Sequence, residues 1–233
     1  MTGATSAATP PVVIAARAAL AVQADPVKAV AMQAYMKSSM PYRGVASPGV
    51  KAVVASVVAD HPFATRDAWL DAALRLWRDA KFREERYVCL GILGQRRYAN
   101  WRDATMLPVY AELVTTGAWW DFVDEIASRH VGPILLAERA VATPVVRGWI
   151  TSPDMWLRRS SIICQLSAKD AVDLDLLTGA IESNASDRDF FVRKAIGWAL
   201  RQHARIDPGW VRTFVDTHPQ LSGLSRREAT KHL

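Results

Sequence analysis

Four aromatic residues that recur at a nearly constant interval constrain the fold of this chain more than any other feature. They are Phe82, Trp119, Trp156 and Phe191, which lie 37, 37 and 35 residues apart. Each follows a helix-like stretch and a short turn that is polar or contains Gly or Pro, and each begins a second helix-like stretch. A period of about 35–47 residues with two helices per unit is typical of HEAT-like α-solenoids. The sequence therefore predicts stacked helix pairs that share one continuous core.

The spacing of apolar residues supports an all-α fold. No clear alternation of apolar and polar residues between hairpin turns is present, whereas helical spacing recurs along the chain. We expect the stack to curve, with the second helices lining a concave face. Three apolar stripes carry this prediction: Trp69, Ala72, Ala73, Leu76 and Trp77; Met106, Leu107, Tyr110, Leu113 and Val114; and Val172, Leu176, Leu177, Ala180 and Ile181.

Capping signals mark several predicted helix starts. Asp207 stands before Pro208, which places a capping side chain ahead of a proline at the first helical position. Ser225 and Glu228 have the spacing of a capping box, as do Ser186 and Asp189. We therefore expect helices to begin after Asp207, Ser225 and Ser186.

The domain organisation is predicted to be simple. Residues 1–24 form an N-terminal segment with an Ala-rich helix, and residues 25–233 form one continuous repeat array. The apolar stretch Val12–Leu20 has no basic residue before it and is interrupted by Arg17, so it is interpreted as a helix rather than a signal peptide. No apolar run approaches the roughly 20 residues that span a bilayer. A cytoplasmic location without membrane association is expected.

The distribution of charge points to a polyanionic partner. The formal net charge is +6, and from Arg188 to the C-terminus nine Lys and Arg stand against four Asp and Glu. A basic concave face suits a rod-like polyanion, with nucleic acid the first candidate. A basic surface that only contacts solvent is the alternative, and charge alone does not separate the two.

Cofactor chemistry has little support in the sequence. Cys89 and Cys164 lie in apolar helical stretches and are predicted to be small buried residues. The five histidines show no metal-ligand spacing with them, and neither a phosphate-binding Gly-rich loop nor a nucleophile elbow occurs. We expect no metal and no cofactor.

The segment Trp119–Asp124 is the strongest candidate for chemistry. Trp120 and Asp124 are four residues apart, so on a helix they share one face. An aromatic surface beside a carboxylate is unusual on a solvent-exposed face. The alternative, a core tryptophan with surface aspartates, is favoured when this segment is taken alone, because tryptophans are mostly buried.

Two later segments add cations and a further aromatic residue. Arg158 and Arg159 follow Trp156 and are candidates for phosphate contacts, although a solvated charged face is the default interpretation. Lys194, Trp198 and Arg201 share one helical face, where the tryptophan would pack on sugar and the cations bind phosphates. Gly197 disfavours a helix, so it is expected to allow a neighbouring element to pack closely.

These segments resemble the AlkD-like DNA alkylation repair family. The similarity runs from about Pro26 to the C-terminus. The matching motifs are Trp119–Asp124, Trp156–Arg159, Phe190–Arg201, Leu224–His232 and, in the N-terminal region, Ala34–Lys37 with Gly44–Pro48. The resemblance implies HEAT-like repeats wrapped around duplex DNA and a monofunctional glycosylase acting on cationic alkylpurines such as 3-methyladenine and 7-methylguanine.

The resemblance also implies roles for individual residues. Trp120, Asp124 and Trp198 match the family's catalytic residues. Arg159 and Arg201 match DNA-binding arginines, Lys194 is placed beside them, and Tyr35 matches a tyrosine near the lesion. Ala46 departs from the longer polar residue of the family member compared, which puts the substrate range in doubt. The family leaves the lesioned base in the duplex, so bulky adducts are conceivable substrates alongside small methylated bases.

One carboxylate is chemically sufficient for this substrate. Most glycosidases need a second carboxylic acid to protonate the leaving group, but alkylation at N3 or N7 already makes the base a cationic leaving group. A monomer suffices for such a site. A non-catalytic protein that binds damaged or branched DNA, and a protein-binding helical scaffold, remain as alternatives. Asp124 favours the enzyme over the former, and the basic last repeats disfavour the latter.

Overall fold

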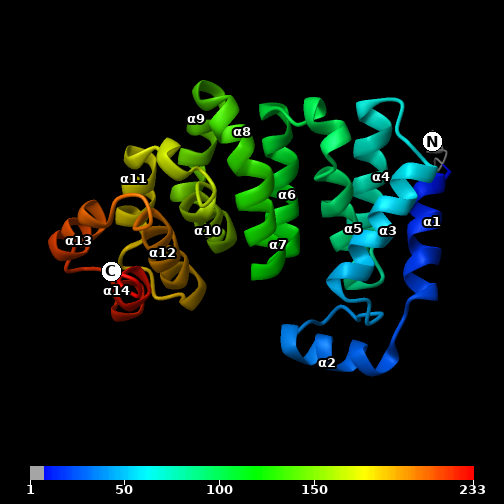
Figure 1. Ribbon diagram of the computed structural model, residues 1–233, viewed down its shortest axis with the longest axis horizontal. Helices are drawn as coiled ribbons and strands as arrows, with labels where there is room; N and C mark the ends of the chain where they lie inside the picture. The colour runs from blue at the N-terminus through cyan, green and yellow to red at the C-terminus, as the bar shows by residue number, and fades with distance from the viewer. Residues whose placement is uncertain (1–7) are drawn as a thin grey trace, which may run out of the picture. The chain divides into compact units, whose positions relative to one another are not determined.

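The computed structural model describes residues 8–233 and is all-helical over that part of the chain, with no strand (Figure 1). The prediction of an all-α fold is confirmed. The chain divides into two compact units, residues 1–101 and 102–233. The predicted boundary between residues 24 and 25, and the predicted curvature, stay predictions.

The first unit contains an Ala-rich helix, a separate short helix and a three-helix core. Figure 1 shows that α2 stands apart from the other helices of this unit, which pack on one another. The buried face of α1, which includes Val13 and Leu20, packs against α3. The helices are α1 (Pro11–Val22), α2 (Pro26–Met36), α3 (Ser47–Asp60), α4 (Arg66–Arg78) and α5 (Arg83–Leu93).

The second unit continues the helix pairs and ends in two short helices. Each pair packs within itself, and α7, α10 and α12, the second helices of successive pairs, also pack on one another. The helices are α6 (Leu107–Gly117), α7 (Trp120–Glu125), α8 (Gly132–Ala137), α9 (Arg139–Ile150), α10 (Met155–Ile163), α11 (Leu174–Asn184), α12 (Phe190–His203), α13 (Pro208–Thr217) and α14 (Gly223–Ala229).

The periodic aromatic residues begin helices as predicted. Phe82 and Trp119 immediately precede α5 and α7, and Trp156 and Phe191 are the second residues of α10 and α12. The stripes in α4 and at the start of α6 are fully buried. Val172 is an exception, because Asp173 caps α11 through the Leu176 N–H (3.0 Å) and leaves Val172 outside the helix, partly exposed.

Two predicted helix starts are wrong, and the third is confirmed. The Asp207 side chain accepts from the Trp210 N–H (2.8 Å) with Pro208 at the helix start, as expected. Ser222 rather than Ser225 caps α14, because its hydroxyl accepts from the Ser225 N–H (3.0 Å). Asp189 rather than Ser186 caps α12, by accepting from the N–H groups of Phe191 and Val192.

Candidate functional site

The periodic aromatic residues of the second unit form one cluster. The ring of Trp119 lies 6.1 Å from that of Trp156 and 5.5 Å from that of Phe191, and the last two rings are 5.0 Å apart, centroid to centroid. Each residue stands at the start of a second helix. The cluster therefore brings the first turns of α7, α10 and α12 together, and with them the residues one turn further along.

Asp124, on the second turn of α7, forms a two-pronged ion pair with Arg159 of α10. The Arg159 Nε donates to Asp124 Oδ1 (2.8 Å), and Nη2 donates to Oδ2 (2.9 Å). A third bond runs from Arg159 Nη1 to the Phe191 carbonyl oxygen on α12. One guanidinium thus joins three helices, and its fork geometry fixes the orientation of the carboxylate.

The exposure of the two partners differs in a way that matters for chemistry. The Arg159 side chain is 4% exposed, whereas the Asp124 side chain is 17% exposed. Arg159 is therefore covered by protein, while part of the Asp124 side chain is open to solvent. Burial raises the pKa of Asp124 above its ordinary value, although hydrogen bonds and charge from Arg159 act in the opposite direction.

A π-helical turn follows Asp124. It spans Ile126–Val131 and continues directly into α8. The Ser128 hydroxyl donates to the Asp124 carbonyl oxygen (2.6 Å), which satisfies a backbone acceptor of the catalytic candidate. Gly132 closes the turn, and a Cβ there would lie 2.4 Å from the Cys164 carbonyl oxygen, so the stretch after α10 packs tightly against it. Such π turns often occur at functional sites.

Trp120, the other residue predicted on this face, begins α7 and is partly exposed. It lies four residues before Asp124 on continuous helix, so the two side chains share a face as expected. The structure thus places an indole and the partly open Asp124 side chain on the same side of α7.

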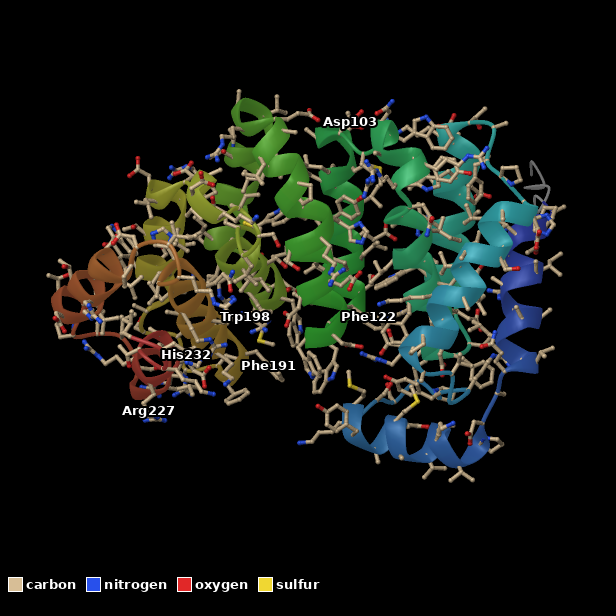
Figure 2. All side chains as sticks on the ribbon, viewed as in Figure 1. Asp103, Phe122, Phe191, Trp198, Arg227 and His232 are labelled. Atoms are coloured by element: carbon tan, nitrogen blue, oxygen red, sulfur yellow. The ribbon has the colours of Figure 1, made fainter. Side chains whose placement is uncertain are left out.

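The predicted face of α12 is present and carries an extra ion-pair partner. Figure 2 shows Trp198 on this helix, beyond Phe191 at its start. Trp198 is partly exposed, and Lys194 and Arg201 lie on either side of it along the helix. Both cations pair with Glu228 of α14, at 2.6 Å for the Lys194 Nζ.

Gly197 has the packing role that the sequence predicts. A Cβ at this position would lie 2.4 Å from the Glu228 Cβ and 2.8 Å from the Ser225 carbonyl oxygen. Only a glycine lets α14 approach α12 this closely, and that approach places Glu228 beside the two cations.

Tyr35 belongs to the first unit, on α2, where its side chain is 76% exposed. Ala46 is exposed in the same unit and precedes α3. The other predicted site residues all belong to the second unit.

Three features of the site were missed by sequence reasoning. The spacing of Ser225 and Glu228 indicates a capping box and gives no sign that Glu228 bridges two cations. The Phe191 carbonyl was not foreseen either, because no side-chain pattern signals a backbone acceptor. Arg158 turns away from Arg159: its Nη2 donates to Asp187 (2.9 Å) and its Nη1 to the Ser152 carbonyl (2.8 Å), which ties two loops together.

The described residues offer few other sites. Among residues 8–233, no group of three or more His, Cys, Asp or Glu side chains is placed to hold a metal ion. Both cysteines are buried, and burial raises the pKa of Cys164 to about 12, which keeps its thiol protonated. No helix in this part of the chain is long and apolar enough to cross a membrane.

Comparison with known proteins agrees with the motif resemblance. The model of the family described as DNA alkylation repair enzyme matches residues 16–233. A solved structure described as a predicted DNA alkylation repair enzyme from Enterococcus faecalis is similar with a TM-score of 0.78 and 28% sequence identity, covering 91% of this chain and 97% of that chain. No curated protein matches the chain. The resemblance expected from the sequence is confirmed, and the chain belongs to the DNA alkylation repair enzyme family.

Proposed function

We propose that this protein is a monofunctional DNA glycosylase that hydrolyses the N-glycosidic bond of cationic N3- or N7-alkylated purines in duplex DNA. Family membership supports the coarser statement, an enzyme of DNA alkylation repair. The proposal adds the reaction and the substrate class. It also holds that the protein acts as a monomer and needs no metal.

The observation that carries the proposal is the state of Asp124. Its carboxylate accepts two hydrogen bonds from a buried guanidinium, and yet the side chain is partly open to solvent. The guanidinium fixes the orientation of the carboxylate, and the accessible part of the side chain leaves room for a substrate to approach. A carboxylate held in this way is suited to stabilising positive charge that develops on a substrate.

The reaction needs only one carboxylate because the substrate already carries the positive charge that a second carboxylic acid would otherwise provide by protonating the base. An alkylated purine is already cationic, so its departure needs no acid to protonate it. As the glycosidic bond breaks, positive charge develops on the deoxyribose. Asp124 stabilises this charge and orients the attacking water, while Arg159 holds the carboxylate in place and favours its ionised form.

The surrounding residues bind the duplex. Trp120 and Trp198 pack on the sugar and backbone and favour the developing cation through their rings. Lys194 and Arg201 bind phosphates, whereas Arg159, which is covered by protein, acts through its ion pair with Asp124. Tyr35 contacts the DNA near the lesion. The proposal also holds that the base stays in the duplex, as the family resemblance implies. Such a route needs no pocket for an extruded base, so the proposal extends to bulky adducts.

The test is release of base from defined duplexes. The protein is incubated with a duplex carrying 7-methylguanine and, separately, one carrying a bulky N3-adenine adduct, and freed base and abasic sites are quantified. Asp124→Asn is expected to lower the single-turnover rate about 100-fold or more. Asp175→Asn is the matched control, because Asp175 is exposed in the first turn of α11.

Two further measurements make the result interpretable. Asp124→Asn leaves Arg159 with a weaker partner, so thermal unfolding and binding to the damaged duplex are measured on the same variant. A variant that is folded and binds but does not release base supports the proposal. Tight binding of the wild type with no release from either duplex would favour a non-catalytic protein that binds damaged or branched DNA.

A further inference from the structure

Glu228 forms ion pairs with both cations that flank Trp198, Lys194 and Arg201. Its Oε1 accepts from Lys194 Nζ at 2.6 Å, and its Oε2 accepts from Arg201 Nη1. The two cations lie seven residues apart on α12, and one carboxylate bridges them. The side chains of Glu228, Lys194 and Arg201 are 16%, 40% and 22% exposed. The bridge therefore lies at the surface of the second unit.

The position of Glu228 is fixed by how α14 crosses α12. At the crossing, Gly197 leaves no space between its own backbone and the Glu228 Cβ. One turn earlier on α14, the fully buried Ser225 donates its hydroxyl to the Arg193 carbonyl (2.9 Å). These contacts fix the backbone and the Cβ of Glu228, so its carboxylate is held beside the two cations.

The bridge resembles the contact that a DNA phosphate would make. A carboxylate, like a phosphate, presents two anionic oxygens to cationic donors. Hydrogen bonds from Lys194 and Arg201 hold the pKa of Glu228 below its usual value, so it is ionised at neutral pH. Two positive charges and one negative charge leave this group of three side chains with a net charge of only +1.

We infer that Glu228 acts as a resident counter-ion that withholds Lys194 and Arg201 from ordinary phosphates and so weakens binding to undamaged duplex DNA. The inference rests on the proposed function, in which these two cations bind DNA. A repair enzyme gains from such a restraint because undamaged sites vastly outnumber lesions and compete for the protein. Glu228 thus limits the affinity for undamaged DNA and need not touch the reacting atoms.

Salt dependence of binding to an undamaged duplex tests this inference. Each cation that newly binds a phosphate steepens the slope of log K against log salt concentration by about 0.9. Glu228→Gln is therefore expected to bind more tightly than the wild type at low salt, with a slope steeper by about 0.9 to 1.8. Between about 50 and 200 mM salt, the variant should lose roughly 3- to 12-fold more affinity than the wild type.

Glu182→Gln is the matched control. It removes the same charge from the same unit, but its carboxylate pairs with His218 rather than with the α12 cations. A double variant, Lys194→Gln with Glu228→Gln, should lose about half of the added slope, because one of the two released cations is then absent. Thermal unfolding of each variant shows that it is folded, and a merely structural role of Glu228 would not steepen the slope.

The outcomes separate this inference from the proposed function. If the wild type releases alkylated base but Glu228→Gln binds undamaged DNA like Glu182→Gln, the inference fails and the function stands. Weaker binding by Glu228→Gln would also overturn it and would show that the bridge positions the cations for DNA. If the wild type binds no duplex, both the inference about Glu228 and the proposed function are wrong.

Discussion

The ionisation of Asp124 is set by two opposing effects. Burial raises the pKa of its carboxyl, and the bonds and charge of Arg159 partly offset that rise. The proposed chemistry needs the ionised form. Excision should therefore fall as the pH falls through a single-proton transition that lies above the ordinary range of an aspartate.

Removing the charge of Arg159 should move this transition. Arg159→Gln takes away the opposite charge, so the pKa of Asp124 rises further and the acid limb of the rate profile shifts upward by about 1–3 pH units. Arg158→Gln is the control, since that neighbouring side chain pairs with Asp187 instead. The measurement is the pH dependence of single-turnover excision. An unchanged acid limb in Arg159→Gln would show that Asp124 does not control the rate.

Gly197 allows a stability prediction with a close control. In Gly197→Ala the new methyl group would overlap Glu228 and the Ser225 backbone, so α14 must shift, at a cost of about 1–3 kcal/mol in free energy of unfolding. At Gly179 in α11 nothing lies within 4 Å of the added Cβ. Gly179→Ala should therefore stabilise the protein by up to about 1 kcal/mol. Urea unfolding gives the free energy of unfolding of both variants. Equal effects of Gly197→Ala and Gly179→Ala would contradict the close crossing of α12 and α14.

At the scale of single elements, the sequence predicts the existence of helices better than their ends. The stripe Trp69–Trp77 and the periodic aromatic residues depend on spacing, which local sequence carries directly. The start of α14 depends on which serine faces the free N–H groups, and that is decided by packing. Ser225 is drawn into the α12 interface, which leaves Ser222 as the cap.

In the candidate site, too, local spacing predicts some features and packing between helices decides the others. Trp120 and Asp124 could be placed together because they share one helix. The pairing of Asp124 with Arg159 could not be derived from spacing, since 35 residues separate them and the contact depends on how α7 packs on α10. Glu228 was missed for the same reason, as its partners lie 34 and 27 residues away in the chain.

The start of α5 yields a prediction for the first unit. The Glu84 carboxylate is fully buried and accepts from three successive backbone N–H groups, those of Arg43, Gly44 and Val45, at 2.9–3.1 Å. It holds the loop between α2 and α3, in which Gly44 has a φ of 87°.

Glu84→Gln should lower the free energy of unfolding by about 1–3 kcal/mol. The three bonds to Oε1 would lose their charge-assisted character, and the amide NH2 would replace Oε2, which faces the Arg43 N–H at 3.0 Å. Glu125→Gln, at a surface pair with Arg129, should cost less than about 1 kcal/mol. Chemical denaturation checks both. A negligible effect at Glu84 would mean that the loop is not held by this carboxylate.

At the scale of the whole molecule, the net charge is divided unevenly between the two units. Residues 1–101 contain thirteen Lys and Arg against seven Asp and Glu, whereas residues 102–233 contain sixteen of each. The basic C-terminal region is thus balanced by acidic residues earlier in its own unit. The first unit carries the whole formal excess of +6, so this unit is expected to contribute to the attraction of DNA.

Tyr35 tests whether the first unit also contributes to excision of the lesion. The side chain is 76% exposed on α2, so Tyr35→Ala should change the free energy of unfolding by less than about 0.5 kcal/mol. If the ring contacts DNA near the lesion, losing about 1–3 kcal/mol of stacking should slow single-turnover excision roughly 5- to 150-fold. Tyr35→Phe keeps the ring and should retain most of the rate.

Val30→Ala is the control for the Tyr35 variants, because Val30 lies on the same helix and is 72% exposed. It should leave both stability and excision near the wild-type values. Excision is measured with the protein in excess over a 7-methylguanine duplex, so that product release does not limit the rate. Wild-type excision by Tyr35→Ala would confine the lesion contacts to the second unit and leave the first unit a role in general DNA attraction only.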